Sequence, residues 1–169
     1  MLNLYKYYSD PESLTGYKDR IKYVPNLAYE KAMKTPNRRS PELEPIILKH
    51  PYSAYFYAKD VINGRWPEAE PSIMKDATAA YHYAKDVING RWPKAEPTIM
   101  KNASNAYWYA VNVIKGRWPE AEPIIMKDPY FAYTYARDII KDRWPEAEPY
   151  IMNDKTTTGS YKQFIKSLG

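Results

Sequence analysis

The chain of 169 residues has no cysteine, only six glycines and three phenylalanines, and no long apolar run. Without cysteine, disulfide frameworks, thiolate nucleophiles and zinc–thiolate sites are excluded, and a reducing compartment is compatible. No segment approaches the ~18–20 apolar residues that a membrane-spanning helix needs. The opening MLNLYKYYSDPE is not that of a signal peptide, because no apolar core follows a basic start. A cytoplasmic protein without a membrane partner is therefore expected.

Positive charge gathers at the two ends of the chain, which carries +5 overall. Residues 1–50 have nine basic and six acidic side chains, and residues 153–169 have three and one. The central residues 51–152 have thirteen of each and are neutral. Because a nucleic-acid-binding protein more commonly has a basic body, this distribution favours solvated charge at the ends.

Tyrosine, proline and internal repetition are abundant, with 18 Tyr and 15 Pro. Trp66, Trp92, Trp118 and Trp144 are spaced by 26 residues within motifs of the form GRWPEAEP. A second motif precedes each of them, as in AYFYAKDVI at 54–62. A degenerate copy of the two motifs, with Ser40 in place of tryptophan, precedes these four copies. The repeats predicted from this period are 25–50, 51–76, 77–102, 103–128 and 129–154.

Each repeat predicts two helices, the first from about Tyr52 to Asn63. The positions that stay constant fall within an arc of about 160°, which is a wide apolar stripe. They are Ala54, Tyr55, Tyr57, Ala58, Val61 and Ile62. Gly64 is expected to end the helix in a left-handed conformation, which Asp142 in the last repeat would adopt less well.

The second helix is expected to be short, about two turns. Pro67 can open it because proline tolerates the first helical turn. Pro71 should restart or kink it one turn later. Ile73 and Met74 are expected to supply its buried side.

A repeat of this size cannot bury its apolar stripe alone, whereas stacked copies can. The predicted fold class is therefore all-α, an α-solenoid of five helical hairpins in 25–154. Residues 1–24 are expected to form an N-terminal cap. Residues 155–169 should form a capping helix, because one apolar face carries Tyr161, Phe164, Ile165 and Leu168.

The motif AYWYAVNVIKGRWPEAEP resembles the tetratricopeptide consensus, with a shorter second helix. This resemblance implies a right-handed superhelix whose first helices line the concave surface. Over about residues 4–154 the chain also resembles short-repeat proteins encoded by tailed phages, through the same Ala-Tyr-x-Tyr-Ala and Arg-aromatic-Pro-Glu motifs. That second resemblance implies a viral source and carries over no catalytic residue.

Positions that differ between repeats are the candidates for partner binding. The most informative column is Phe56, His82, Trp108 and Thr134, because one core position would not accept four such different volumes and polarities. Positions 52, 53, 56 and 59 and their equivalents are expected to lie opposite the apolar stripe. An exposed aromatic cluster commonly marks an interaction site; packing of Phe56 and Trp108 on the next repeat is an equal alternative. The candidate partner-binding residues are Tyr52, Phe56, Lys59, His82, Lys85, Trp108, Tyr130, Thr134 and Arg137.

An arginine column could instead follow a phosphate backbone, as in repeat proteins that bind RNA. Each arginine has its own glutamate, so a structural ladder that links repeats, with arginine also stacked on tryptophan, is favoured. Its members are Arg39, Arg65, Arg91, Arg117, Arg143, Glu44, Glu70, Glu96, Glu122 and Glu148. The tryptophan and methionine columns are interpreted as core.

Neither a catalytic nor a metal site is expected, and no cofactor. His50 and His82 belong to different columns, and no second ligand repeats with either. Paired carboxylates such as Glu68 and Glu70 recur in nearly every repeat, whereas catalysis needs one special place. The leading hypothesis is a non-enzymatic phage protein that binds a host or viral protein through the first helices. Nucleic-acid binding and a structural, self-associating role are the alternatives.

Overall fold

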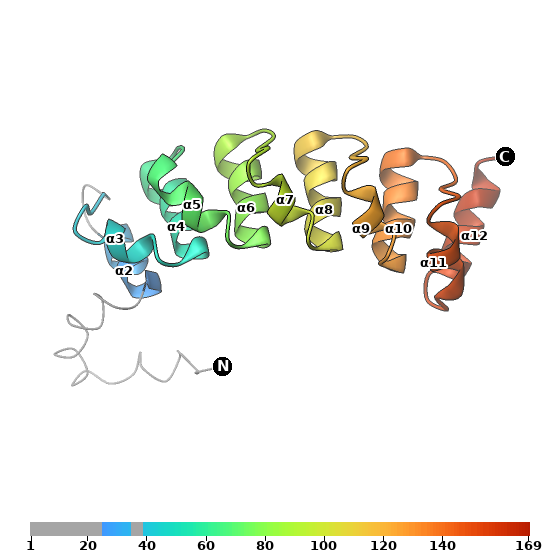
Figure 1. The fold of residues 1–169 in the computed structure, drawn as a ribbon, viewed down its shortest axis with the longest axis horizontal. Coiled ribbons are helices and arrows are strands. Elements are labelled where there is room, and N and C mark those ends of the chain that lie inside the picture. The colour runs from blue at the N-terminus through green and yellow to red at the C-terminus, as the bar shows by residue number, and fades with distance from the viewer. Residues whose placement is uncertain (1–24, 35–38) are drawn as a thin grey trace. The chain divides into compact units, whose positions relative to one another are not determined.

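The computed structural model describes residues 25–34 and 39–169 (Figure 1). This part of the chain consists of helices and turns without a strand, so the prediction of an all-α protein is confirmed for it. The predicted N-terminal cap, 1–24, lies outside the described residues. The chain divides into two compact units, Met1–Ile73 (unit 1) and Met74–Gly169 (unit 2).

Unit 1 contains short helices that alternate with turns. Its described elements are α2 (Pro25–Met33), α3 (Glu44–Ile47), α4 (Pro51–Tyr57), the π-helical turn η3 (Ala58–Ile62), the 3₁₀ turn η4 (Pro67–Ala69) and α5 (Glu70–Ile73). Helix α2 packs against both α3 and α4. The inward-facing side chains of this packing include Ala28, Ala32 and Ile47, which have no exposed surface.

Unit 2 repeats one succession three times, a first helix, a π-helical turn and a short second helix, and then adds a final helix. The elements are α6 (Ala77–Tyr83), η5 (Ala84–Ile88), α7 (Glu96–Ile99), α8 (Ala103–Tyr109), η6 (Ala110–Ile114), α9 (Glu122–Ile125), α10 (Pro129–Tyr135), η7 (Ala136–Ile140), α11 (Glu148–Asn153) and α12 (Thr158–Ser167). First helices α6, α8 and α10 lie side by side, with α8 in contact with both neighbours (Figure 1). Each second helix packs on the helix before it and on the helix after it.

Side-chain caps fix where the first helices begin. Asp76, Asn102 and Asp128 precede α6, α8 and α10, and each accepts a hydrogen bond from the backbone N–H three residues on. His50 does the same for α4 through its ring nitrogen. Such a bond satisfies one of the N–H groups that a helix start leaves free.

The first helices end differently from the sequence-based expectation. The left-handed residue is Asn63, Asn89, Lys115 or Lys141, one position before the expected glycine. In η6 the carbonyl of Ala110 accepts the N–H of Lys115 at 2.7 Å and that of Gly116 at 3.2 Å. The π-helical turn therefore places residue 115, and not Gly116, in the left-handed conformation.

This geometry corrects the roles given to Gly64 and Asp142. The glycines at 64, 90 and 116 have no positive φ, and an added Cβ would meet nothing within 4 Å. Aspartate at position 142 therefore carries no penalty from the backbone conformation. The energetic cost of the left-handed conformation arises instead at Lys115 and Lys141, where it is roughly 1 kcal/mol or more for each lysine.

Gly116→Ala is expected to raise the free energy of unfolding by about 0.4–1 kcal/mol, because alanine fits this backbone and restricts the unfolded chain. Lys115→Gly should also stabilise, by about 0.5–1 kcal/mol, because glycine adopts the left-handed conformation readily. Urea unfolding followed by circular dichroism measures both. A loss of stability in Gly116→Ala would instead place the left-handed residue at the glycine.

Proline shapes the second helices as expected. In unit 1, Pro67 opens the 3₁₀ turn η4, and α5 begins at Glu70 with Pro71 in its first turn. Proline also stands in the first turn of α7, α9 and α11, where no intrahelical N–H is needed. The second helix is thus restarted after one turn.

Four residue columns form most of the core. Tyr57, Tyr83, Tyr109 and Tyr135 have no exposed surface, and the tryptophans that follow them, Trp66, Trp92, Trp118 and Trp144, are at most 3% exposed. Each ring of this tyrosine column lies about 5 Å from the tryptophan nine residues later, in a tilted arrangement. The isoleucines of the second helices and the alanines of the first helices fill the remaining interior.

The methionine column does not belong to this core. Met74, Met100 and Met126 are half-buried, and Met152 is 37% exposed. The preceding isoleucine takes the inward direction, and a neighbouring residue on so short a helix points about 100° away. The interpretation of these methionines as core filler was wrong.

Helix α12 packs against α11 and repeats the position of a first helix. Tyr161 has no exposed surface and lies 26 residues after Tyr135. The predicted apolar face is only partly buried, because Phe164 and Ile165 are half-buried and Leu168 is 43% exposed.

Candidate functional site

The arginine column pairs with glutamate inside each hairpin. Arg91 binds Glu96 through two hydrogen bonds of 2.9 and 2.8 Å, and Arg117 binds Glu122 through two of 2.9 Å. Arg143 and Glu148 do the same, as do Arg39 with Glu44 and Arg65 with Glu70 in unit 1. These bonds raise the pKa of Arg91, Arg117 and Arg143 and lower the pKa of Glu148.

The expected link between repeats is not made by arginine, since each pair lies five residues apart in one hairpin. Tyrosine makes the link between neighbouring repeats instead. The backbone N–H of Trp92 donates to the hydroxyl of Tyr109 at 2.6 Å, and that hydroxyl donates to Glu96 at 3.0 Å. The same bonds join Trp118, Tyr135 and Glu122, and then Trp144, Tyr161 and Glu148.

The sequence contained a signal for this link, because the tyrosine column lies 17 residues after the tryptophan column. The apolar stripe predicts that this tyrosine is buried, but it does not show which groups its hydroxyl bonds to. Nor do Arg91, Arg117 and Arg143 lie over an aromatic ring in the described part of the chain, so the expected stacking on tryptophan is absent there. The observed bonds account for the arginine column without a ligand.

A second tyrosine column bonds to the following hairpin. Tyr29 donates to Asp60 at 2.8 Å in unit 1, and Tyr107 donates to Asp138 at 2.7 Å in unit 2. Burial, more than these bonds, raises the pKa of Tyr107 to about 12. At the equivalent place Asn112 reverses the bond, because its amide donates to Tyr81 at 2.9 Å.

The candidate partner-binding residues of unit 1 lie on and just after α4. Phe56 is 39% exposed, and its ring is 4.7 Å from that of Tyr55 and 6.0 Å from that of Tyr29. Lys59 is exposed, with its ammonium 5.8 Å from the centre of the Tyr55 ring. Tyr52 is half-buried.

In unit 2 the candidates lie on α6, α8 and α10 and on the π-helical turns. Trp108 is 44% exposed and Tyr130 is 58% exposed, whereas His82 is half-buried. Lys85 lies 3.5 Å from Asp86, and Arg137 forms two short bonds with Asp138 and lies over the ring of Tyr133. The cations of both pairs are the more exposed partners.

Thr134 does not share the exposure of its column, since it is 3% exposed. Its short side chain turns back onto α10, where the hydroxyl donates to the carbonyls of Tyr130 and Phe131. A threonine of this kind bonds to the backbone of its own helix. The expectation that Thr134 faces a partner is therefore corrected.

Three members of the column at position 53 are also buried, contrary to expectation, and the fourth, Phe131, is half-buried. Ser53, Ala79 and Asn105 are at most 9% exposed. Asn105 donates to the hydroxyl of Thr78 on α6, so this column faces the neighbouring first helix. Variation there reflects contacts between helices and not a free surface.

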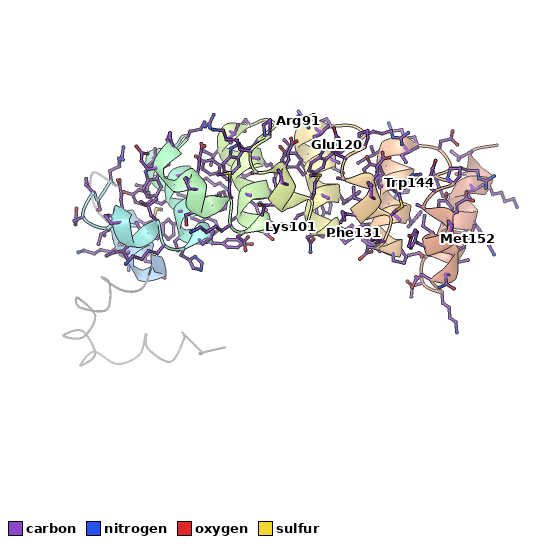
Figure 2. The ribbon with its side chains drawn as sticks, viewed as in Figure 1. Arg91, Lys101, Glu120, Phe131, Trp144 and Met152 are labelled. Carbon is purple, nitrogen blue, oxygen red and sulfur yellow. The ribbon has the colours of Figure 1, made fainter. Side chains whose placement is uncertain are left out.

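Four aromatic rings make a continuous run across α8 and α10. The ring of Tyr107 lies 4.9 Å from Trp108 and 5.6 Å from Phe131, whose ring lies 5.2 Å from Tyr130. The two ends of this aromatic run, Trp108 and Tyr130, are the exposed members. Figure 2 shows Phe131 and Lys101 toward one edge of unit 2 and Arg91 and Glu120 toward the other.

A shallow depression of about 420 Å³ lies beside Pro129, the residue that precedes Tyr130 in α10. Its lining consists of Pro129, Pro149, Tyr150, Asn153 and Asp154. The carboxylate of Asp154 accepts from Thr156 and Thr157, so it is committed to the start of α12. The lining is suited to contact with apolar side chains.

No known protein family matches this chain, and neither curated proteins nor solved structures give a significant match. Within residues 25–34 and 39–169, no three His, Asp or Glu side chains are grouped to hold a metal ion. In the same residues, no helix has both the length and the apolar character needed to cross a membrane.

Proposed function

We propose that this chain is a non-enzymatic protein-binding module built as a solenoid of five 26-residue hairpins. Its plan would be similar to that of tetratricopeptide proteins, with 1–24 and 155–169 closing the ends. The sequence motifs further suggest a phage factor that captures a host or viral protein in the host cytoplasm. The first helices would present the binding surface.

The aromatic run carries this proposal. Aromatic side chains are enriched among the residues that dominate protein interfaces, and exposing them to water is unfavourable. Trp108 and Tyr130 remain 44% and 58% exposed although the other tryptophans are buried. The rings of Tyr107 and Phe131 join them into one aromatic surface.

Nucleic-acid binding has weaker support because the regularly spaced arginines are occupied. Each guanidinium already forms a bidentate pair with a largely buried carboxylate. An enzyme also has weaker support. The repeated glutamates accept the same hydrogen bonds from arginine in each hairpin, whereas a catalytic site needs one distinctive place.

The double variant Trp108→Ala with Tyr130→Ala should lose capture of the partner, by about tenfold or more in affinity. Its melting temperature should stay close to that of the wild type, because both side chains are substantially exposed. Affinity purification from a bacterial lysate identifies the partner, and calorimetric titration with the purified partner gives the affinity.

Leu168→Ala is the matched control, because Leu168 is as exposed as Trp108 but lies after α12. It should bind like the wild type. A double variant that captures the same partner undiminished would remove the aromatic run from the interface. One that melts much earlier would make the two residues packing groups.

A further inference from the structure

The hairpin that carries Trp108 departs from its neighbours at two further positions. Lysine or arginine is replaced by Val111, and aspartate is replaced by Asn112. The turn η6 therefore contains no charge, whereas η5 and η7 each contain a cation and a carboxylate. An apolar centre at Trp108 and Val111 lies between two charged flanks.

Asn112 also leaves a hydrogen-bond donor unused. Its amide donates both to the Tyr81 hydroxyl at 2.9 Å and to the Trp108 carbonyl at 2.9 Å. The Tyr107 hydroxyl donates its own hydrogen bond to Asp138. The hydroxyl proton of Tyr81 has no acceptor among the described residues, since asparagine occupies the acceptor's place as a donor.

On both flanks of this centre the cation is more exposed than the carboxylate with which it pairs. The side chain of Lys85 is 41% exposed against 18% for its partner Asp86, and Arg137 is 45% exposed against 33% for Asp138. Among the described residues Lys85 bonds to Asp86 alone and keeps two of its three N–H donors, and Arg137 keeps two of five beside those bonded to Asp138 and Tyr133, so each cation can donate to a second carboxylate. Lys115 and Lys141, at the ends of the same first helices, are also exposed.

We infer that this surface binds an acidic protein segment, with an apolar side chain on Trp108 and carboxylates on either side. This inference rests on the proposed protein-binding function and names its partner chemistry. Packed helices lie 8–10 Å apart, so Lys85 and Arg137 are separated by roughly 16–20 Å. An extended chain covers that distance in about five or six residues.

Asn112→Asp is the decisive variant because aspartate already stands at positions 60, 86 and 138. Folding is therefore preserved, while the new carboxylate accepts the Tyr81 proton and places negative charge beside Trp108. Asn102→Asp is the matched control, because aspartate also stands at the equivalent cap positions 76 and 128, and the same charge is added at the start of α8 and not beside Trp108.

The probe is a synthetic peptide of about nine extended residues, with a central leucine and glutamates on both sides. Its affinity is measured by calorimetry and by emission of Trp108, the exposed tryptophan of the described chain. Wild type should bind it, Asn112→Asp should bind at least about tenfold more weakly, and Asn102→Asp should bind like the wild type. A lysine counterpart of the peptide and an oligothymidylate should not bind.

Equal binding of the acidic peptide to wild type and Asn112→Asp would overturn the inference. So would tighter binding of the lysine peptide or of the oligothymidylate, or no binding of the acidic peptide to the wild type. In each of these cases the loss of capture in the Trp108 and Tyr130 double variant, if observed, would still support the proposed function. Failure of both experiments would remove the function as well.

Discussion

Tyr135→Phe is expected to lower the free energy of unfolding by about 2–4 kcal/mol, although the aromatic ring is retained. The lost hydroxyl is the acceptor for the backbone N–H of Trp118 and a donor to Glu122. Trp118 is 1% exposed, so water cannot replace the acceptor. A buried N–H without a partner and a carboxylate without one of its donors both oppose folding.

Tyr130→Phe is the control within the same helix, because Tyr130 is 58% exposed and its hydroxyl can bond to water. It should change stability by less than about 0.5 kcal/mol. Chemical unfolding of both variants at one temperature provides the comparison. Equal stability of Tyr135→Phe and wild type would show that the hydroxyl does not hold neighbouring hairpins together.

At alkaline pH the protein should unfold cooperatively between about pH 10 and pH 12. Burial is the main cause that raises the pKa of seven described tyrosines, to about 12 for Tyr107. A raised pKa means that the folded state holds the proton more tightly than the unfolded state. The stabilisation is therefore complete below pH ~10, where unfolded tyrosine is neutral, and is lost as pH rises through the folded values.

Phenolate absorbance and far-ultraviolet circular dichroism, recorded on the same samples, measure this transition. The buried phenols should ionise in the same pH interval in which helix is lost, because opening the fold is what gives them their ordinary pKa. Refolding on return to neutral pH controls for irreversible damage. Ionisation of all the tyrosines near pH 10 with the helices intact would contradict the assigned cause.

The sequence predicted the features that depend on periodicity. A constant tryptophan every 26 residues indicated a buried position, and Trp92 and Trp118 are buried. Proline at the expected positions marked the restart of each second helix. These features are local, because side-chain spacing on a helix and the missing N–H of proline act over a few residues.

Features that depend on three-dimensional hydrogen bonding were not predictable in the same way. Glycine at 116 is the usual residue for a left-handed conformation, yet the π-helical turn moves that conformation to Lys115. Thr134 shares a column with Trp108, but side-chain length decides which of them reaches the surface. In both cases the sequence shows which residue stands at the position. Its hydrogen bonds in the fold decide its conformation or its exposure.

The hydrogen bonds of Tyr109 and Tyr107 have a consequence for how unit 2 folds. They join residues 13, 17 and 31 positions apart, so the loops that must close are short. Proteins dominated by such near-neighbour contacts fold quickly, because little chain entropy is lost before each contact forms. Folding can therefore begin at any hairpin and spread to the next, and a nascent chain can gain structure before its later segments exist.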